Sequence, residues 1–158
     1  MQKHPGEWSN EGIAFFENGQ YEEALKCYDH ALDIDPKFTK ALNNKGNVLK
    51  ILGRYEEAIK IFDKAISMDK ENSELYVNKG AVYYEMDDHN LAIQSYNKAL
   101  ELNPENTNAL TNKGAALANS GDLKSGMECF NKALEINPLD VNASINRDKL
   151  RDFIVGRD

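Results

Sequence analysis

A 34-residue repeat runs through the whole sequence and constrains its fold more than any other feature. Counted from Pro5, the repeats cover residues 5–38, 39–72, 73–106 and 107–140, and a half-repeat begins at Val141. The eighth place of each repeat holds Gly12, Gly46, Gly80 or Gly114, and the twenty-fourth place holds Tyr28, Phe62, Tyr96 or Phe130. A period of this length indicates copies of one small supersecondary element that stack on one another.

Each repeat is predicted to form two antiparallel helices. Apolar residues recur at helical spacing, such as Leu42 and Leu49 in the first half of a repeat and Ile59 and Phe62 in the second half. We expect the first helix at places two to fourteen and the second at places eighteen to thirty. The turns between them contain Gly19, Gly53, Asp87 and Gly121. Glycine is common where a helix ends in a left-handed residue, and the glycine at place eight is predicted to let the two helices approach closely.

These residues resemble the tetratricopeptide repeat family, and the resemblance covers nearly the whole chain. It implies an all-α fold, a right-handed α-solenoid of antiparallel helix pairs whose first helices line a concave groove. Residues 1–158 are then expected to be a single domain. Residues 141–154 are expected to form a capping helix, because Asp148 replaces the glycine of the half-repeat and no second helix would pack there. The sequence departs from the family at its tryptophan, which only Trp8 carries.

Composition and motifs argue against several functions. The net charge of −7 argues against binding to nucleic acid or to acidic membranes. No apolar run approaches the ~20 residues of a membrane span. Two cysteines fit a reducing compartment, so a cytoplasmic location is expected. The sequence contains no catalytic motif and no metal-ligand spacing, so we expect no enzymatic activity, no cofactor and no metal.

Asparagine stands at the sixth place of every repeat. This asparagine ladder consists of Asn10, Asn44, Asn78, Asn112 and Asn146. The resemblance implies that this place faces the groove, and some family members hold peptide backbones with such a ladder. An asparagine amide can both donate to and accept from an extended peptide. The alternative is that asparagine is simply common at this place in the family and faces the groove wall or solvent.

The remaining groove residues are expected at places two, five, nine, twelve and thirteen. The first two repeats supply Gly6, Ser9, Ile13, Phe16, Glu17, Lys40, Asn43, Asn47, Lys50 and Ile51. The next two supply Glu74, Val77, Ala81, Tyr84, Glu85, Asn108, Thr111, Ala115, Ala118 and Asn119. From these we select as candidate peptide-binding residues, beside the ladder, Lys40, Asn43, Asn47, Lys50, Tyr84, Asn108 and Asn119. The alternative is a solvated surface without a ligand.

One family activity is not supported by the residues present. Chaperone-binding members hold a terminal carboxylate with lysines and arginines at fixed groove places. In the only matching frame, Asn43, Asn108 and Asn112 occupy the places of those cations. Without cations, a terminal carboxylate loses its charge-assisted hydrogen bonds.

Two function classes therefore remain. The first is a non-enzymatic scaffold that binds an extended segment of an unidentified protein or peptide in its groove. The second is a structural module that self-assembles through its ends or its groove. Polar residues at the terminal repeats favour the first class, and with it a monomer, because end-to-end stacking needs apolar ends.

Overall fold

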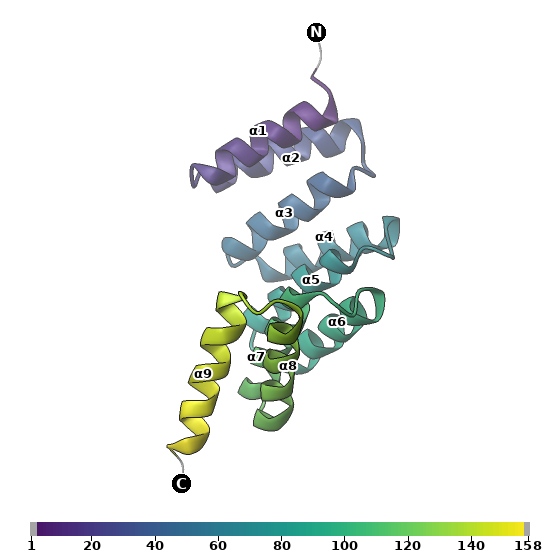
Figure 1. Ribbon diagram of the computed structural model, residues 1–158. Coiled ribbons are helices and arrows are strands. Elements are labelled where there is room, and N and C mark those ends of the chain that lie inside the picture. Colours follow the sequence, from purple (N-terminus) through teal and green to yellow (C-terminus); the bar gives the residue numbers. More distant parts are fainter. Residues whose placement is uncertain (1–2, 157–158) are drawn as a thin grey trace. The chain divides into compact units, whose positions relative to one another are not determined.

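The computed structural model describes residues 3–156, and this part of the chain forms nine α-helices and no strand (Figure 1). The helices are α1 (Pro5–Glu17), α2 (Tyr21–Ile34), α3 (Thr39–Ile51), α4 (Tyr55–Met68), α5 (Ser73–Glu85), α6 (His89–Leu102), α7 (Thr107–Asn119), α8 (Leu123–Ile136) and α9 (Val141–Val155). The chain divides into two compact units, an N-terminal unit of residues 1–71 and a C-terminal unit of residues 72–158. The all-α class and the paired helices predicted from the 34-residue period are confirmed.

The turn inside each repeat has the left-handed residue that the sequence predicts. The φ angle is 73° at Gly19, 72° at Gly53, 63° at Asp87 and 97° at Gly121. In the first repeat the Gly19 amide donates to the carbonyl of Phe16, and the next amide, that of Gln20, donates to Phe15. The other three repeats have the same pair of hydrogen bonds. The paired bonds satisfy carbonyls at the end of the first helix and turn the chain back for the second.

The glycine at place eight gives room to the aromatic ring at place twenty-four of the same repeat. A Cβ built on Gly80 would lie 2.6 Å from Cε1 of Tyr96, and one built on Gly46 would lie 2.6 Å from Cζ of Phe62. Gly12 and Gly114 meet the rings of their own repeats equally closely. The four rings are at most 1% exposed. In each hairpin the ring on the second helix therefore packs directly on the backbone of the first helix at its glycine. The predicted close approach of the two helices is therefore confirmed.

All four second helices end at the same place, whether or not a proline follows. Pro36, Pro104 and Pro138 follow three of them, while α4 ends at Met68 with Lys70 in the proline place. In every repeat the amide after the helix donates to the carbonyl of an alanine four residues earlier, as Asp69 does to Ala65 at 3.0 Å. The proline therefore reinforces an end that the packing of the repeat already sets.

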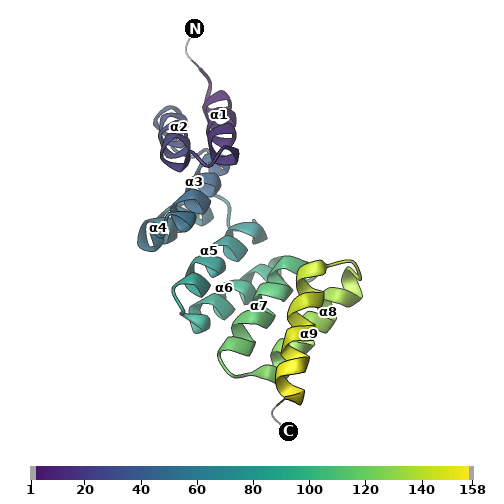
Figure 2. The same cartoon turned by 90° about the vertical axis from the view of Figure 1, so that its left-hand side faces the viewer.

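Helix α9 completes the C-terminal unit and lies against α7 and α8 (Figure 2). The side chain of Asp140 caps it by accepting from the Ala143 amide at 2.9 Å. Ala143 and Leu150 form its buried side. Within residues 3–156, no helix combines the length and apolar composition needed to cross a membrane.

Two of the four buried rings carry a phenol that should make stability sensitive to alkaline pH. Burial raises the pKa of Tyr28 to about 12 and moves the pKa of Tyr96 upward as well. An unfolded tyrosine has a pKa of about 10. Because the folded state keeps these protons longer, their contribution to stability is complete below about pH 10 and is lost as pH rises toward 12.

We therefore expect the double variant Tyr28→Phe, Tyr96→Phe to lose less stability than the wild type above pH 10. Phenylalanine fits the place, because Phe62 and Phe130 occupy it in the other repeats. Urea denaturation at pH 8, 10 and 11 measures the effect. Parallel losses in the two proteins would contradict the assignment of the alkaline sensitivity to these phenols.

Candidate peptide-binding surface

The five ladder asparagines all lie at the sixth place of a first helix. Asn10 on α1 is exposed, whereas the four other ladder side chains are half-buried. The N-terminal unit contains Asn10 and Asn44, and the C-terminal unit contains Asn78, Asn112 and Asn146. Each unit also has a hollow that includes a ladder residue.

The hollow of the N-terminal unit has a volume of about 260 Å³ and lies between α1 and α3. It is lined by Ile13, Phe16, Glu17, Tyr28, Asn44 and Asn47. All but Tyr28 stand at places that the repeat pattern assigns to the groove or the ladder. The structure thus brings two asparagine amides together with apolar side chains in one hollow.

The Asn44 amide has an unusual environment. Its Nδ2 atom is buried and has no hydrogen-bond acceptor within residues 3–156. A buried donor without an acceptor costs about 1–3 kcal/mol relative to the hydrated amide. A ligand carbonyl that draws the amide toward the hollow would remove this cost.

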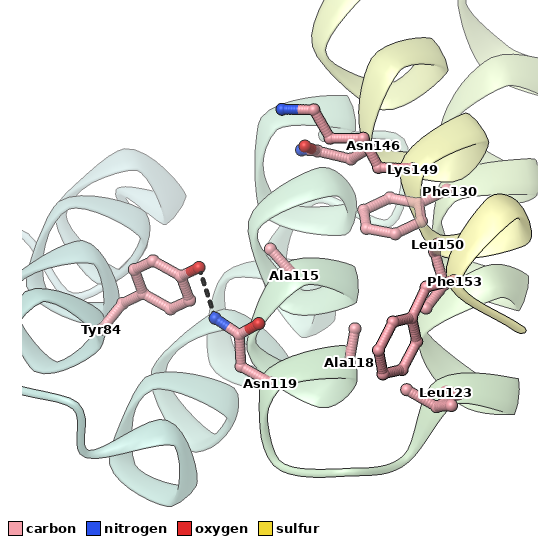
Figure 3. Close-up of a pocket in the computed structure, with 10 residues that line it drawn as sticks. All are labelled: Tyr84, Ala115, Ala118, Asn119, Leu123, Phe130, Asn146, Lys149, Leu150 and Phe153. Carbon is pink, nitrogen blue, oxygen red and sulfur yellow. Dashed lines mark hydrogen bonds between the residues drawn. The ribbon is translucent and has the colours of Figure 1, made fainter. Parts of the chain in front are cut away.

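The pocket of the C-terminal unit that includes a ladder residue is larger, at about 440 Å³ (Figure 3). It is lined by Tyr84, Ala115, Ala118, Asn119, Leu123, Phe130, Asn146, Lys149, Leu150 and Phe153. The Asn119 Nδ2 donates to Oη of Tyr84 at 2.7 Å, which connects α7 to α5 at one side of the pocket (Figure 3). Three candidate residues from the sequence, Tyr84, Asn119 and Asn146, therefore lie around one pocket.

Two pocket residues that the sequence analysis missed follow from its own pattern. Lys149 and Phe153 stand at the ninth and thirteenth places of the half-repeat, both of which are groove places. Extending the pattern beyond Asn146 would have identified them. Leu123, Phe130 and Leu150 carry no such signal, because they belong to packing faces.

Several candidate residues lie outside these two hollows. Asn10, Lys40, Asn43, Lys50, Asn78, Asn108 and Asn112 line neither of them. Asn10, Lys40 and Asn108 are exposed, and the other four are half-buried. Their role in binding stays a prediction from the repeat register.

The assignment of place five to the groove is wrong for three repeats. Ser9 is 0% exposed, Val77 is 7% exposed and Thr111 is 5% exposed. In the C-terminal unit, Val77 packs in one cluster with Ala109 and Ala116 of the following first helix. The next repeat therefore contributes to the burial of Val77. Ile145, at the same place of α9, is 46% exposed.

The environment of the two cysteines favours a packing role over a reactive one. Cys27 is buried and Cys129 is partly buried, and burial raises the pKa of both thiols. Both thiols thus stay protonated, which makes them poor nucleophiles. No group of His, Cys, Asp and Glu side chains that could hold a metal ion occurs in the described part of the chain.

Three tetratricopeptide repeat models match the sequence, at residues 12–52, 37–105 and 95–126. With the helix pairs and the repeated turns, these matches show that the chain belongs to the tetratricopeptide repeat family. No curated protein sequence matches it.

Solved structures with the same fold include bacterial and peptide-bound examples. The Pseudomonas aeruginosa pilF structure has a TM-score of 0.85 at 23% identity over 97% of this chain and 72% of that one, a likeness that shows the fold. YrrB, described as a TPR protein with an unusual peptide-binding site, has a TM-score of 0.71 at 29% identity over 96% and 78%. The first TPR of Spaghetti (RPAP3), bound to the HSP90 peptide SRMEEVD, has a TM-score of 0.70 at 26% identity over 74% of this chain and 93% of that one.

Proposed function

We propose that this protein is a non-enzymatic interaction scaffold that binds an extended peptide segment of a partner through its asparagine ladder. Proteins of this family serve in general as protein-interaction modules, and two of the similar structures are described by their peptide binding. The proposal treats residues 5–140 as four repeats of one domain, capped by residues 141–154. It also places the protein in the cytoplasm, where Cys27 and Cys129 would stay reduced.

The observation that carries the proposal is the composition of the two hollows. Each combines asparagine amides with apolar side chains, and each contains a single charged residue, Glu17 in the first and Lys149 in the second. Amides recognise the N–H and C=O groups that every peptide backbone presents, while apolar walls add affinity without demanding a fixed charge pattern.

The bound segment should not depend on a terminal carboxylate. Chaperone-binding members of the family hold a terminal carboxylate with lysines and arginines, and this chain has Asn43, Asn108 and Asn112 at those places. A scaffold of this kind would accept an internal stretch of a partner, because its amides need no chain terminus.

The test uses peptides selected from a random library displayed against the wild-type protein. With a selected peptide added, we expect the largest NMR shifts at the side-chain amides of the ladder and at residues of the two hollows. Shifts confined to α2, α4, α6 and α8 would contradict the proposal, because those helices carry no ladder residue.

Self-association is a second candidate function, and exposed apolar residues at the C-terminal end favour it. Leu139 is 87% exposed, Val141 is 67% exposed and Val155 is 65% exposed. Apolar surface of this kind is a common feature of contact sites between proteins.

Size-exclusion chromatography with light scattering distinguishes the two candidates. We expect the mass of a monomer across a hundredfold concentration range. In a full repeat a second helix would pack on one face of α9, and this face is polar, with Ser144, Asp148 and Arg151. A mass that grows with concentration, and returns to the monomer in the variant Leu139→Glu, Val141→Glu, would instead support self-assembly.

A further inference from the structure

We propose that the pocket between α7 and α9 sets specificity: it takes a large apolar side chain of the bound peptide, and Lys149 pairs with an acidic side chain next to it. This inference rests on the proposed peptide-binding function and adds to it the class of sequence that the partner presents.

The pocket is open because the fourth repeat has small residues where the first two repeats have larger ones. The twelfth place holds Phe16, Lys50 and Tyr84 in the first three repeats but Ala118 in the fourth. The ninth place holds Ile13 and Asn47 in the first two repeats but alanine in the third and fourth, Ala81 and Ala115. The missing side-chain volume leaves a space between α7 and α9 (Figure 3).

The floor and walls of this space are apolar. They consist of Ala115, Ala118, Leu123, Phe130, Leu150 and Phe153. Figure 3 shows the Phe153 ring beside Ala118, with Leu123 below it at one end. The ring is 50% exposed. An apolar side chain that enters the pocket would cover this ring, and burial of apolar surface is favourable in proportion to its area.

The charge at the pocket selects an acidic neighbour for that side chain. Lys149 is the only charged residue among those that line the pocket. Its charged neighbours on α9 balance as two arginines and two aspartates, because Asp148 lies 3.1 Å from Arg147 and 3.5 Å from Arg151, and Asp152 lies 3.7 Å from Arg151. Lys149 has no carboxylate partner within residues 3–156. Its ammonium group is therefore available to a carboxylate of a ligand.

The polar groups around the pocket are suited to the peptide backbone on either side of the anchor. Figure 3 shows the head groups of Lys149 and Asn146 directed away from α9, toward the side on which Tyr84 lies. The Asn119 amide and the Tyr84 hydroxyl stand at that side, joined by their hydrogen bond. A single lysine fits one acidic side chain in an internal segment better than a chain terminus, which the family holds with several cations.

The experiment uses nine-residue peptides with blocked ends, taken from the selection on the wild-type protein and resynthesised with Leu, Phe or Ala at the anchor position. The residue beside the anchor is Asp, Asn or Lys. Fluorescence anisotropy gives the dissociation constants. We expect Leu or Phe to bind roughly tenfold or more tightly than Ala, and Asp to bind about 2- to 5-fold more tightly than Asn.

Two variants of the protein test the assignment to this pocket. Ala118→Phe, which copies the residue at the same place of the first repeat, should remove the preference for a large anchor while leaving the Ala peptide unaffected. Lys149→Glu should reverse the neighbour preference from Asp to Lys. Lys132→Gln, on the exposed side of α8, is the matched control and should change neither preference.

The outcomes separate this inference from the function on which it rests. Peptides that shift the ladder amides but show no anchor preference, or keep both preferences in the two variants, would overturn the inference and leave the scaffold function standing. Failure of every peptide to shift a ladder amide would overturn the scaffold function itself.

Discussion

Replacing Gly80 with leucine should lower the free energy of unfolding by more than about 2 kcal/mol. The first atom of the new side chain alone would lie 2.6 Å from the Tyr96 ring, well inside van der Waals contact. The ring itself is only 1% exposed, so it has no free space into which to turn. The hairpin of α5 and α6 would have to open, exposing the core of the C-terminal unit. Urea denaturation followed by circular dichroism measures the loss.

Gly6 provides the control for this substitution. A Cβ there would meet no atom within 4 Å, and the residue lies in the first turn of α1. Gly6→Ala should therefore keep stability or raise it by up to about 1 kcal/mol, since alanine is the better helix former. A Gly80→Leu variant as stable as the wild type would show that Tyr96 does not pack on this glycine and that the repeat register is wrong.

Changing Asn44, Asn78 and Asn112 together to alanine should abolish most peptide binding and leave the fold intact. Each lost hydrogen bond is worth roughly 0.5–1.5 kcal/mol net, so three amides with two bonds each imply a loss of several kcal/mol. Thermal stability should hold or rise, because alanine favours helix more than asparagine does. For Asn44 the change also removes a buried donor that has no acceptor within residues 3–156.

The control for the triple variant changes three exposed asparagines on second helices. Asn90, Asn97 and Asn131 lie on α6 and α8, away from the first helices that carry the ladder. Their replacement by alanine brings the same gain in helix propensity and should leave peptide affinity unchanged. Equal losses of affinity in the two triple variants would show that the effect does not come from the ladder.

The parts of this structure that the sequence predicts are those set by short-range contacts. Each repeat contains the turn residue with a positive φ that follows its first helix. It also contains both the glycine and the aromatic ring, sixteen residues later, that packs on it. Both features therefore depend on contacts within a single repeat. Four copies of the pattern therefore predict the turns at Gly19 and Asp87 and the packing of Gly80 on Tyr96. Even Asp87, which breaks the glycine pattern, takes the predicted conformation at φ 63°.

The surface is harder to predict, because its exposure depends on the following repeat. Val77 stands at a place that the repeat pattern assigns to the groove, yet it is buried in a cluster that includes Ala109 and Ala116 of the next repeat. The pocket between α7 and α9 likewise combines residues that are distant in sequence, because Ala115 and Ala118 line it from α7 and Phe153 lines it from α9. A pattern read within a single repeat cannot contain these contacts.

The central claim is that neutral asparagine amides hold the backbone of a bound peptide, and calorimetry tests it most directly. A library-selected peptide is titrated into the wild type and into the Asn44, Asn78, Asn112→Ala variant, at 50 mM and 500 mM salt. We predict that the variant loses several kcal/mol of binding free energy and that this loss is nearly the same at both salt concentrations, because screening acts on charges and not on neutral amides. Unchanged affinity in the variant would contradict the claim and move the binding site away from the ladder.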